Sequence, residues 1–540
     1  MFYFLTLCLC DDGMEVKLKQ GIVRGHLSSS YEEKNYLAFE GIPYAKPPVG
    51  DLRFAPPEPA EGWDGVLEGN KLYTCAQLLP LPYIWGPSGT EDCLYLYVYV
   101  PGDTIIKDAK LPVIVHIHGG AFMLGSPRSM ALPDYLMDQD VVYVTMNYRL
   151  GILGFLSTED AVVPGNMGLK DQSLALKWIK ENIHEFGGNA DSITITGLSA
   201  GGASVHYHYL SPMSKGLFSR GISHSGTALQ TWALTENPLQ KAILVAKNVS
   251  CDTDTTQKMV ACLRSKSHKE IIIAIDGLFV LISAIPPTPF GPVIEKGGHN
   301  PFIDDHPYKL LKEKKVYDVP WINSNVKDEG IFPVGFFLHM KKMDYIAENW
   351  DTVMPSAFDM NDTVENSLKK EIVNKIKTFY YGSDLVTANN AENLVKAFSD
   401  RYFFVDSELA TRTHSAAVTS PVYFYFYNFL PESNFQLRGI KPGVAHGLDA
   451  KLLYKWIILA NLKSKEKQMM IVLTNFLKKF ATTGVPEING VKWDPIEPNN
   501  KDIKYLEINS PDDIEMNTMD KLGSNEFWNS LPINENNHIY

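Results

Sequence analysis

One serine of this 540-residue chain stands in a pattern that makes serine hydroxyls reactive. Ser199 is the middle residue of segment 197–201, Gly-Leu-Ser-Ala-Gly, which follows the apolar, β-branched run 192–196. A buried strand that ends in a Gly-x-Ser-x-Gly turn before a helix is typical of a nucleophile elbow, in which a strained turn holds the serine at the helix N-terminus. Chance supplies about 0.2 such matches in a chain of this length, so the pattern needs support from other segments.

Three further segments with suitable chemistry follow strand-like runs. Segment 118–122, His-Gly-Gly-Ala-Phe, comes directly after run 111–117. Its glycine pair leaves backbone N–H groups free to face a developing oxyanion. Glu329 and His446 follow two later strand-like runs. Because open α/β sheets place their sites at the carboxyl ends of strands, these residues are expected together, in the order serine, acid, histidine that α/β-hydrolases use.

Strand-like and helical runs alternate along most of the chain, which predicts a mostly parallel sheet covered by helices on both faces. The expected strands are 111–117, 141–146, 192–196, 319–323 and 422–427, and the expected helices are 172–186, 203–210 and 467–480. Short strands at 16–26, 36–40 and 94–100 predict a small antiparallel N-terminal sheet. We therefore expect an α/β fold with a large, mostly parallel central sheet.

Composition excludes several classes of function. The formal net charge of −12 argues against nucleic-acid binding, which needs a basic surface. No apolar run reaches the roughly 18 residues of a membrane span. We expect no cofactor, because there is no Gly-rich phosphate loop, and no metal, because no cysteine or carboxylate cluster completes a site around His116, His118, His206 and His208.

Four of the six cysteines form two local pairs, Cys75 with Cys93 and Cys251 with Cys262, as loop-closing disulfides do. Such pairs indicate an oxidising, secretory compartment, although four unpaired thiols in a cytoplasmic protein remain the alternative. Asn-x-Ser/Thr acceptors for glycosylation occur at Asn248 and Asn361.

The N-terminal residues 1–14 are apolar but short, with neither a positively charged start nor a clear cleavage site. They are either a secretion signal or a disordered leader. Residues 15–540 contain no internal repeat and no low-complexity linker, so we expect one domain there. The sequence leaves the oligomeric state open.

The ordered set of motifs resembles the type-B carboxylesterase/cholinesterase family, and most of all insect carboxylesterases, from about residue 15 to beyond His446. The matching segments are 39–45, 91–96, 118–122, 147–151, 166–172, 186–189 and 197–201. The resemblance implies an α/β-hydrolase fold and a serine carboxylic-ester hydrolase that acts on small-molecule esters without a cofactor.

The resemblance also implies a role for each site residue. Ser199 would be the nucleophile, Glu329 the acid and His446 the base, since a serine hydroxyl needs a base within about 3 Å and the base needs an acid to fix its tautomer. The implied oxyanion hole consists of the N–H groups of Gly120, Ala121 and Ala200. Gly119 would allow its turn, Ser225 would support the acid, and the two cysteine pairs would be Cys75–Cys93 and Cys251–Cys262.

The chain departs from the family at positions that bear on substrate. Leu198 stands where the family often has Glu or Gln, Tyr97 where it usually has Asn, and His224 where Gln is common. An apolar residue beside the serine favours neutral, hydrophobic esters (xenobiotic, pheromone or dietary) over the cationic esters of cholinesterases. Trp85 lies in the first disulfide loop, where cholinesterases hold a cation, although loop packing is its simpler role. Trp232 and Phe290 lie in segments that line the acyl pocket of relatives. For both residues two roles stay open, which are lining this pocket and packing in the core.

Two other functions stay open at this point. The first is a non-catalytic adhesion or binding protein on the same fold, although such relatives typically lack a member of the triad. The second is an esterase of slow turnover that sequesters toxic esters.

Overall fold

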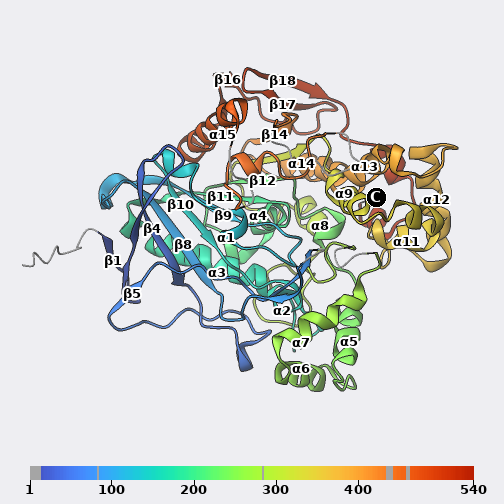
Figure 1. Ribbon diagram of the computed structural model, residues 1–540, viewed down its shortest axis with the longest axis horizontal. Helices are drawn as coiled ribbons and strands as arrows, with labels where there is room; N and C mark the ends of the chain where they lie inside the picture. Colours follow the sequence, from blue (N-terminus) through green and yellow to red (C-terminus); the bar gives the residue numbers. More distant parts are fainter. Residues whose placement is uncertain (1–13, 82–83, 282–284, 433–441, 458–461, 540) are drawn as a thin grey trace, which may run out of the picture.

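The computed structural model describes residues 14–81, 84–281, 285–432, 442–457 and 462–539. The proposed leader therefore lies, except for residue 14, outside the described residues. The centre of the molecule is an eleven-stranded sheet with the order β18-β17-β14-β13-β12-β11-β9-β10-β8-β4-β3 (Figure 1). Its strands are β3 (His26–Ser29), β4 (Asn35–Pro43), β8 (Tyr95–Pro101), β9 (Leu111–Ile117), β10 (Val142–Met146), β11 (Gly188–Leu198), β12 (Arg220–His224), β13 (Trp321–Val326), β14 (Val422–Tyr427), β17 (Ile503–Ser510) and β18 (Asp513–Met519).

The sheet is parallel from β10 to β17 and antiparallel at both ends. This confirms the predicted α/β-hydrolase fold. A small N-terminal sheet is present, in which β1 (Glu15–Lys17) and β2 (Ile22–Arg24) pair antiparallel and β5 (Val66–Glu68) pairs parallel with β2. The predicted strands 36–40 and 94–100 are not part of it, because they lie in β4 and β8 of the central sheet. Two-stranded pieces complete the sheets: β6 (Gln77–Leu81) with β7 (Ile84–Ser88), and β15 (Glu487–Ile488) with β16 (Val491–Lys492).

Side chains that alternate along β9 fill two different cores. Val113, Val115 and Ile117 pack with α3 (Met167–Asn182) and α4 (Ala200–Leu210), whereas Ile114 belongs to a second core that contains the buried face of α15 (Ser464–Thr483). Apolar side chains on both faces of one strand are what a sheet covered by helices on both faces requires. The expected helices thus lie on opposite faces of the sheet.

The other helices follow or interrupt the strands. They are α1 (Pro127–Met130), α2 (Gly151–Phe155), α5 (Pro238–Asn248), α6 (Thr256–Ser265), α7 (His268–Ile273), α8 (Pro307–Lys312), α9 (Ile331–His339), α10 (Met343–Glu348), α11 (Trp350–Ala357), α12 (Asn366–Tyr381), α13 (Glu392–Ser399), α14 (Val405–Ala417), α16 (Asn525–Asn529) and α17 (Asn534–Ile539). A π-helical turn, Asp400–Phe404, joins α13 to α14. The C-terminus lies among α9 and α11–α13, at the right of Figure 1. None of the described helices combines the length and the apolarity needed to cross a membrane.

Two disulfides and buried ion pairs fix the loops around this sheet. Both predicted disulfides, Cys75–Cys93 and Cys251–Cys262, are present. The Arg53 guanidinium pairs with Glu91 at 2.5 Å, two residues before Cys93, and also donates to the carbonyl oxygen of Leu263, one residue after Cys262. Arg53 therefore ties the two disulfide loops together.

Candidate active site

Ser199 occupies a strained turn between β11 and α4. Its backbone angles, φ 59° and ψ −122°, lie in a region that non-glycine residues rarely adopt and that is stable only where neighbouring structure enforces it. A Cβ added to Gly197 would lie 2.2 Å from the carbonyl carbon of Gly201, and one added to Gly226 would lie 1.9 Å from the carbonyl oxygen of Ser199. The turn is thus packed so closely that glycine is required at both positions. The Ser199 N–H donates to the carbonyl oxygen of His224 at 2.8 Å.

The predicted acid and base are in contact. His446 Nδ1 lies 2.6 Å from Glu329 Oε2. The other carboxylate oxygen of Glu329 accepts hydrogen bonds from Asn325 Nδ2 at 3.1 Å and from the Val326 N–H at 3.0 Å. Glu329 is fully buried. Two donors on one oxygen and the imidazole on the other fix the orientation of the carboxylate and direct the opposite ring nitrogen of His446, Nε2, away from it.

The loop that carries His446 packs against the elbow. A Cβ added to Gly447 would lie 2.9 Å from Leu198 Cδ2, so this loop lies directly on the residue before the serine. Among the described residues no hydrogen bond joins the Ser199 hydroxyl to His446. This is common in structures without a bound substrate, where catalytic hydrogen bonds tighten only in the complex. The rings of Phe332 and Phe403 flank the imidazole, with centroids 5.6 and 4.7 Å away.

The glycine-rich loop after β9 lies beside Ser199. A Cβ added to Gly119 would lie 3.2 Å from Ser199 Cβ. Gly120 and Ala121 follow with positive φ angles of 112° and 53°. Within the described parts of the chain, the N–H groups of Gly120, Ala121 and Ala200 donate to no protein atom. Three unpaired amides next to one serine are the arrangement expected of an oxyanion hole.

Polar contacts hold this loop in place. Gln77 accepts from the Gly125 N–H at 2.9 Å and donates to the Gly125 carbonyl oxygen at 3.0 Å, and the Tyr148 hydroxyl donates to the His118 carbonyl oxygen at 2.9 Å. His118 stacks on the Tyr148 ring at 4.5 Å, and burial lowers its pKa to about 4. His118 is therefore neutral at physiological pH and serves to brace the loop.

No hydrogen bond joins Ser225 to Glu329 among the described residues. The Ser225 N–H donates to the carbonyl oxygen of Ser324 at 3.0 Å, but its hydroxyl has no hydrogen-bond partner among the described residues. Asn325 and the Val326 N–H supply the hydrogen bonds to Glu329 Oε1 instead. Asn325 was missed in the sequence, and its position four residues before Glu329 at the end of β13 is the signal that could have found it.

The candidate pocket residues are all buried. Leu198, Trp232 and Phe290 are at most 4% exposed. The Trp232 ring lies 6.3 Å from the Phe403 ring, centroid to centroid, and Phe403 in turn contacts His446, so Trp232 belongs to the surroundings of the base. Phe290 lies in the same core cluster as Trp232. The side chain of Trp85 lies outside the described residues.

Comparisons with known proteins agree with this geometry. The family model described as "Carboxylesterase family" matches residues 12–528. The chain belongs to the carboxylesterase family. It is 42% identical to Venom carboxylesterase-6 of Apis mellifera, over 96% of this chain and 94% of the relative, and 37% identical to Esterase FE4 of Myzus persicae, over 93% and 90%.

A solved structure is also similar over nearly its full length. Juvenile hormone esterase from Manduca sexta matches with a TM-score of 0.82 and 26% identity, over 96% of this chain and 99% of the other. The protein is therefore a carboxylic ester hydrolase, and its substrates are small-molecule esters.

This carboxylesterase has a buried charge cluster beneath the elbow that the sequence did not reveal. His224 Nδ1 lies 2.7 Å from the Tyr425 hydroxyl and 3.3 Å from Asp449 Oδ2, and the Tyr425 hydroxyl donates to the same oxygen at 2.6 Å. Burial alone would raise the pKa of the Asp449 carboxyl, but His224 and Tyr425 hold it below its usual value. Because His224 also accepts from the Ser199 N–H, it connects the elbow to the base loop.

The two glycosylation acceptors, Asn248 and Asn361, are exposed. Among the residues that the structure describes, no group of three or more His, Cys, Asp or Glu side chains could hold a metal ion. The close histidine pairs instead make hydrogen bonds within the core, such as His206 Nε2 to His414 Nδ1 at 3.1 Å.

Proposed function

We propose that the enzyme hydrolyses neutral, hydrophobic carboxylic esters through an acyl-enzyme formed on Ser199. The observation that carries the proposal is the 2.6 Å contact between His446 and the fully buried Glu329. The loop that carries His446 packs on the serine elbow. A buried carboxylate at Nδ1 keeps that nitrogen protonated and leaves Nε2 free to accept a proton.

The reaction has two halves. His446 Nε2 accepts the proton of Ser199 as the hydroxyl oxygen attacks the ester carbonyl, and the oxyanion receives hydrogen bonds from Gly120, Ala121 and Ala200. The C–O bond to the alcohol then breaks, and His446 gives its proton to the leaving alcohol. Water repeats the sequence on the acyl-enzyme, which releases the carboxylic acid and restores the serine.

The residues around the serine support a preference for uncharged esters. Leu198 is apolar and 4% exposed, and the loop of His446 packs on it. Trp232 and Phe290 supply further apolar walls for the acyl group. A quaternary ammonium would find no carboxylate at position 198, so a cationic alcohol gains little here.

We also propose that the protein is secreted and glycosylated. Two disulfides and two exposed Asn-x-Ser/Thr acceptors support this. We further propose that residues 15–540 form one domain.

A panel of p-nitrophenyl and alkyl esters, varied separately in acyl and alcohol length, tests the proposal. We expect Ser199→Ala to lose essentially all turnover, and Ser225→Ala, the matched serine whose hydroxyl has no partner, to retain most of it. Carbamylating reagents should give a burst followed by slow release, whose rate also tests the slow-turnover alternative. Full activity of Ser199→Ala would refute the assignment, and a preference for choline esters over neutral esters of the same size would refute the substrate class.

A further inference from the structure

A small cavity away from the triad is lined by several side chains that each carry a polar atom with no partner among the described residues. This acid cavity, of about 50 Å³, lies between the turn 228–231, the start of α14 and the N-terminus of α17. Six lining side chains each have a buried polar atom without a hydrogen bond among the described residues: Gln230 Nε2, Thr231 Oγ1, Thr288 Oγ1, Thr363 Oγ1, Asp406 Oδ2 and Glu535 Oε2. Gln230, Thr288, Thr363 and Asp406 are each at least nine-tenths buried.

The cavity also has an excess of acid groups. Its carboxylates come from Glu236, Asp359, Asp362, Asp406 and Glu535. Lys241 pairs with Asp362 at 2.9 Å, and Arg401 pairs with Glu535 at 2.9 Å. In the part of the chain that the structure describes, no ion pair neutralises the other three carboxylates. Buried polar groups without partners are costly and are rare in native proteins unless water or a ligand satisfies them.

The unpartnered oxygens need hydrogen-bond donors. A cavity of this size has room for about three or four water-sized groups. Five of the six unpartnered atoms are carboxylate or hydroxyl oxygens, which accept hydrogen bonds. No group of acid and histidine side chains among the described residues is arranged to hold a metal ion. The cation that fits is therefore one that donates hydrogen bonds, with water serving the Gln230 amide.

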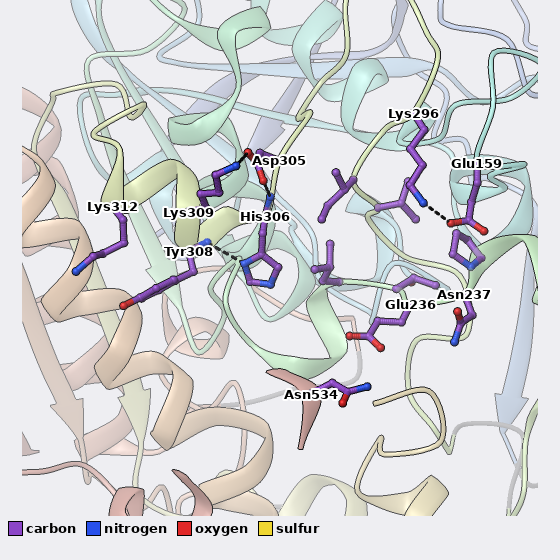
Figure 2. A pocket seen from close by; sticks show the side chains of 15 residues that line it. Glu159, Glu236, Asn237, Lys296, Asp305, His306, Tyr308, Lys309, Lys312 and Asn534 are labelled. Carbon is purple, nitrogen blue, oxygen red and sulfur yellow. Dashed lines mark hydrogen bonds and ion pairs between the residues drawn. The ribbon is translucent and has the colours of Figure 1, made fainter. Parts of the chain in front are cut away.

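A larger pocket adjoins the acid cavity. This outer pocket has a volume of about 760 Å³ and shares five lining residues with the cavity: Leu234, Thr235, Glu236, His306 and Tyr308. Figure 2 shows Glu236 near its centre, with the Lys296–Glu159 pair on one side and the Asp305–Lys309 pair on the other. Pockets of this volume commonly hold small organic molecules.

The charges of the outer pocket restrict the ligand to one positive group. Lys296 and Lys309 are paired at 2.9 and 2.5 Å, and Lys312 lies over the Tyr308 ring. A second ammonium in this pocket would meet these lysines. The apolar walls, which include Leu234, Pro238 and Val293, suit a hydrocarbon chain instead.

We propose that the acid cavity and the outer pocket together bind a primary alkylammonium ion, with the ammonium head in the cavity and the chain in the outer pocket. The head supplies three N–H donors and one positive charge to a cluster whose five carboxylates outnumber the two cations, Lys241 and Arg401, that pair with them. This is a second site, separate from Ser199. Its inner wall continues into the active site, because Thr231 lines the cavity and the ring of the next residue, Trp232, lies beside the Phe403 ring that contacts His446.

The acid–base properties of the cluster give the site a pH dependence. Burial, together with the charges of Glu535, Asp362 and Asp359, raises the pKa of Glu236 to about 7. Burial raises the pKa of Asp406 to about 7 and that of Asp359 to about 6, with Arg401 opposing both shifts. A bound ammonium favours the ionised carboxylates, so binding releases protons and strengthens as the pH rises through this range.

Titration calorimetry of the full chain with n-butylammonium chloride at pH 8 tests the proposal. We expect saturable binding, about tenfold weaker at pH 5.5 because the carboxylates are then protonated. Neither 1-butanol, which has no charge, nor tetramethylammonium, which has no N–H donor, should bind in the same way. Binding should persist after the active-site serine is carbamylated. A failure of carbamylation would count against the proposed function but not against this site.

The decisive variant is Asp406→Asn, which keeps the shape of the side chain and removes its charge. We expect it to weaken butylammonium binding by at least about tenfold and to raise the Tm of the ligand-free protein, because an unpaired buried charge is lost. If Asp406 only supported the fold, Asp406→Asn would lower the Tm instead. Thr363→Val removes a hydroxyl and should also weaken binding, whereas Glu185→Gln, an acid paired with Lys107 elsewhere, should not. No saturable heat, equal binding of 1-butanol, or unchanged affinity in Asp406→Asn would each overturn the proposal.

Discussion

Replacing Glu329 by glutamine tests how the carboxylate controls the tautomer of His446. In the enzyme, Glu329 Oε1 accepts from Asn325 and the Val326 N–H, and Oε2 faces His446 Nδ1. A glutamine has one oxygen and one NH₂ group for these two sides. The oxygen is better placed where two donors converge, because the opposite orientation would set the NH₂ group against both. The NH₂ group then faces His446 Nδ1.

An NH₂ group at that position reverses the hydrogen bond. Nδ1 must accept, so the ring proton moves to Nε2, which can then no longer take the proton of Ser199. In a serine hydrolase a wrong tautomer of this kind costs about 10⁴ in kcat, equivalent to about 5.4 kcal/mol of activation free energy. The hydrogen bonds of the folded protein are conserved in number, so we expect only a small change in the free energy of unfolding.

Steady-state kinetics with p-nitrophenyl acetate and thermal unfolding measure the two effects separately. Asp328→Asn is the matched control, because the same chemical change is made one residue earlier, where the carboxylate accepts from the Val444 N–H at 2.9 Å and asparagine can still accept. We expect it to change kcat by no more than a few-fold. If the Glu329→Gln enzyme kept more than about a tenth of the wild-type kcat, the tautomer argument would be refuted. A further large loss of kcat on adding His446→Ala would also refute it, because the effects of groups that act as a unit are not additive.

Three other predictions concern stability. The carboxyl pKa values of Glu236 and Asp406 are raised, so the folded protein holds protons that the unfolded chain has already released. This cluster therefore destabilises the protein as the pH rises from about 4 to about 7. Asp406→Asn should raise the Tm more at pH 8 than at pH 5, and an equal effect at both would contradict this. Arg149 forms a two-point ion pair with the fully buried Asp171, at 2.8 and 2.6 Å, so urea unfolding of Arg149→Leu should show a loss of about 3–5 kcal/mol, largely recovered when Asp171→Leu is added. The Cys251–Cys262 disulfide closes a short loop and should contribute about 3 kcal/mol, which Cys251→Ala with Cys262→Ala would remove; an unchanged urea midpoint would contradict this.

The elements with strong local signals were predicted well. Runs 111–117 and 422–427 coincide with β9 and β14 residue for residue, because both are rich in β-branched or aromatic side chains that a sheet buries on both faces. β12 was missed, since Arg220–His224 has a single large apolar residue and owes its strand to parallel partners on both sides. The hairpin of β17 and β18 was also missed; β18 lies at the edge of the sheet and has no buried residue.

In the active site, too, some residues could be predicted from the sequence and others could not. Ser199, Glu329 and His446 could be identified from their order and from the motifs around them, but no sequence pattern pairs His224 with Asp449, which are 225 residues apart. That contact depends on the parallel register in which Leu198 pairs with His224, and on the fold of the loop after His446. The family resemblance also assigned the support of Glu329 to Ser225, whereas among the described residues the Ser225 hydroxyl has no hydrogen-bond partner and Asn325 makes the contact.

The buried charges of this enzyme fall into two groups that differ in how they are satisfied. Lys170 and Glu295 are in contact at 2.7 Å although they are 2% and 0% exposed, and Asn166 and the Phe302 N–H occupy the other oxygen of that carboxylate. By contrast, Asp406 Oδ2 has no partner among the described residues, and neither do several other oxygens of side chains that line the same cavity. Asp449 Oδ1, beneath the elbow, also has no partner among the described residues, but the acid cavity brings six such atoms around one space. The concentration of unpartnered oxygens at one cavity therefore argues for a missing partner rather than for loose packing, and a small cation with N–H donors is the partner that their chemistry specifies.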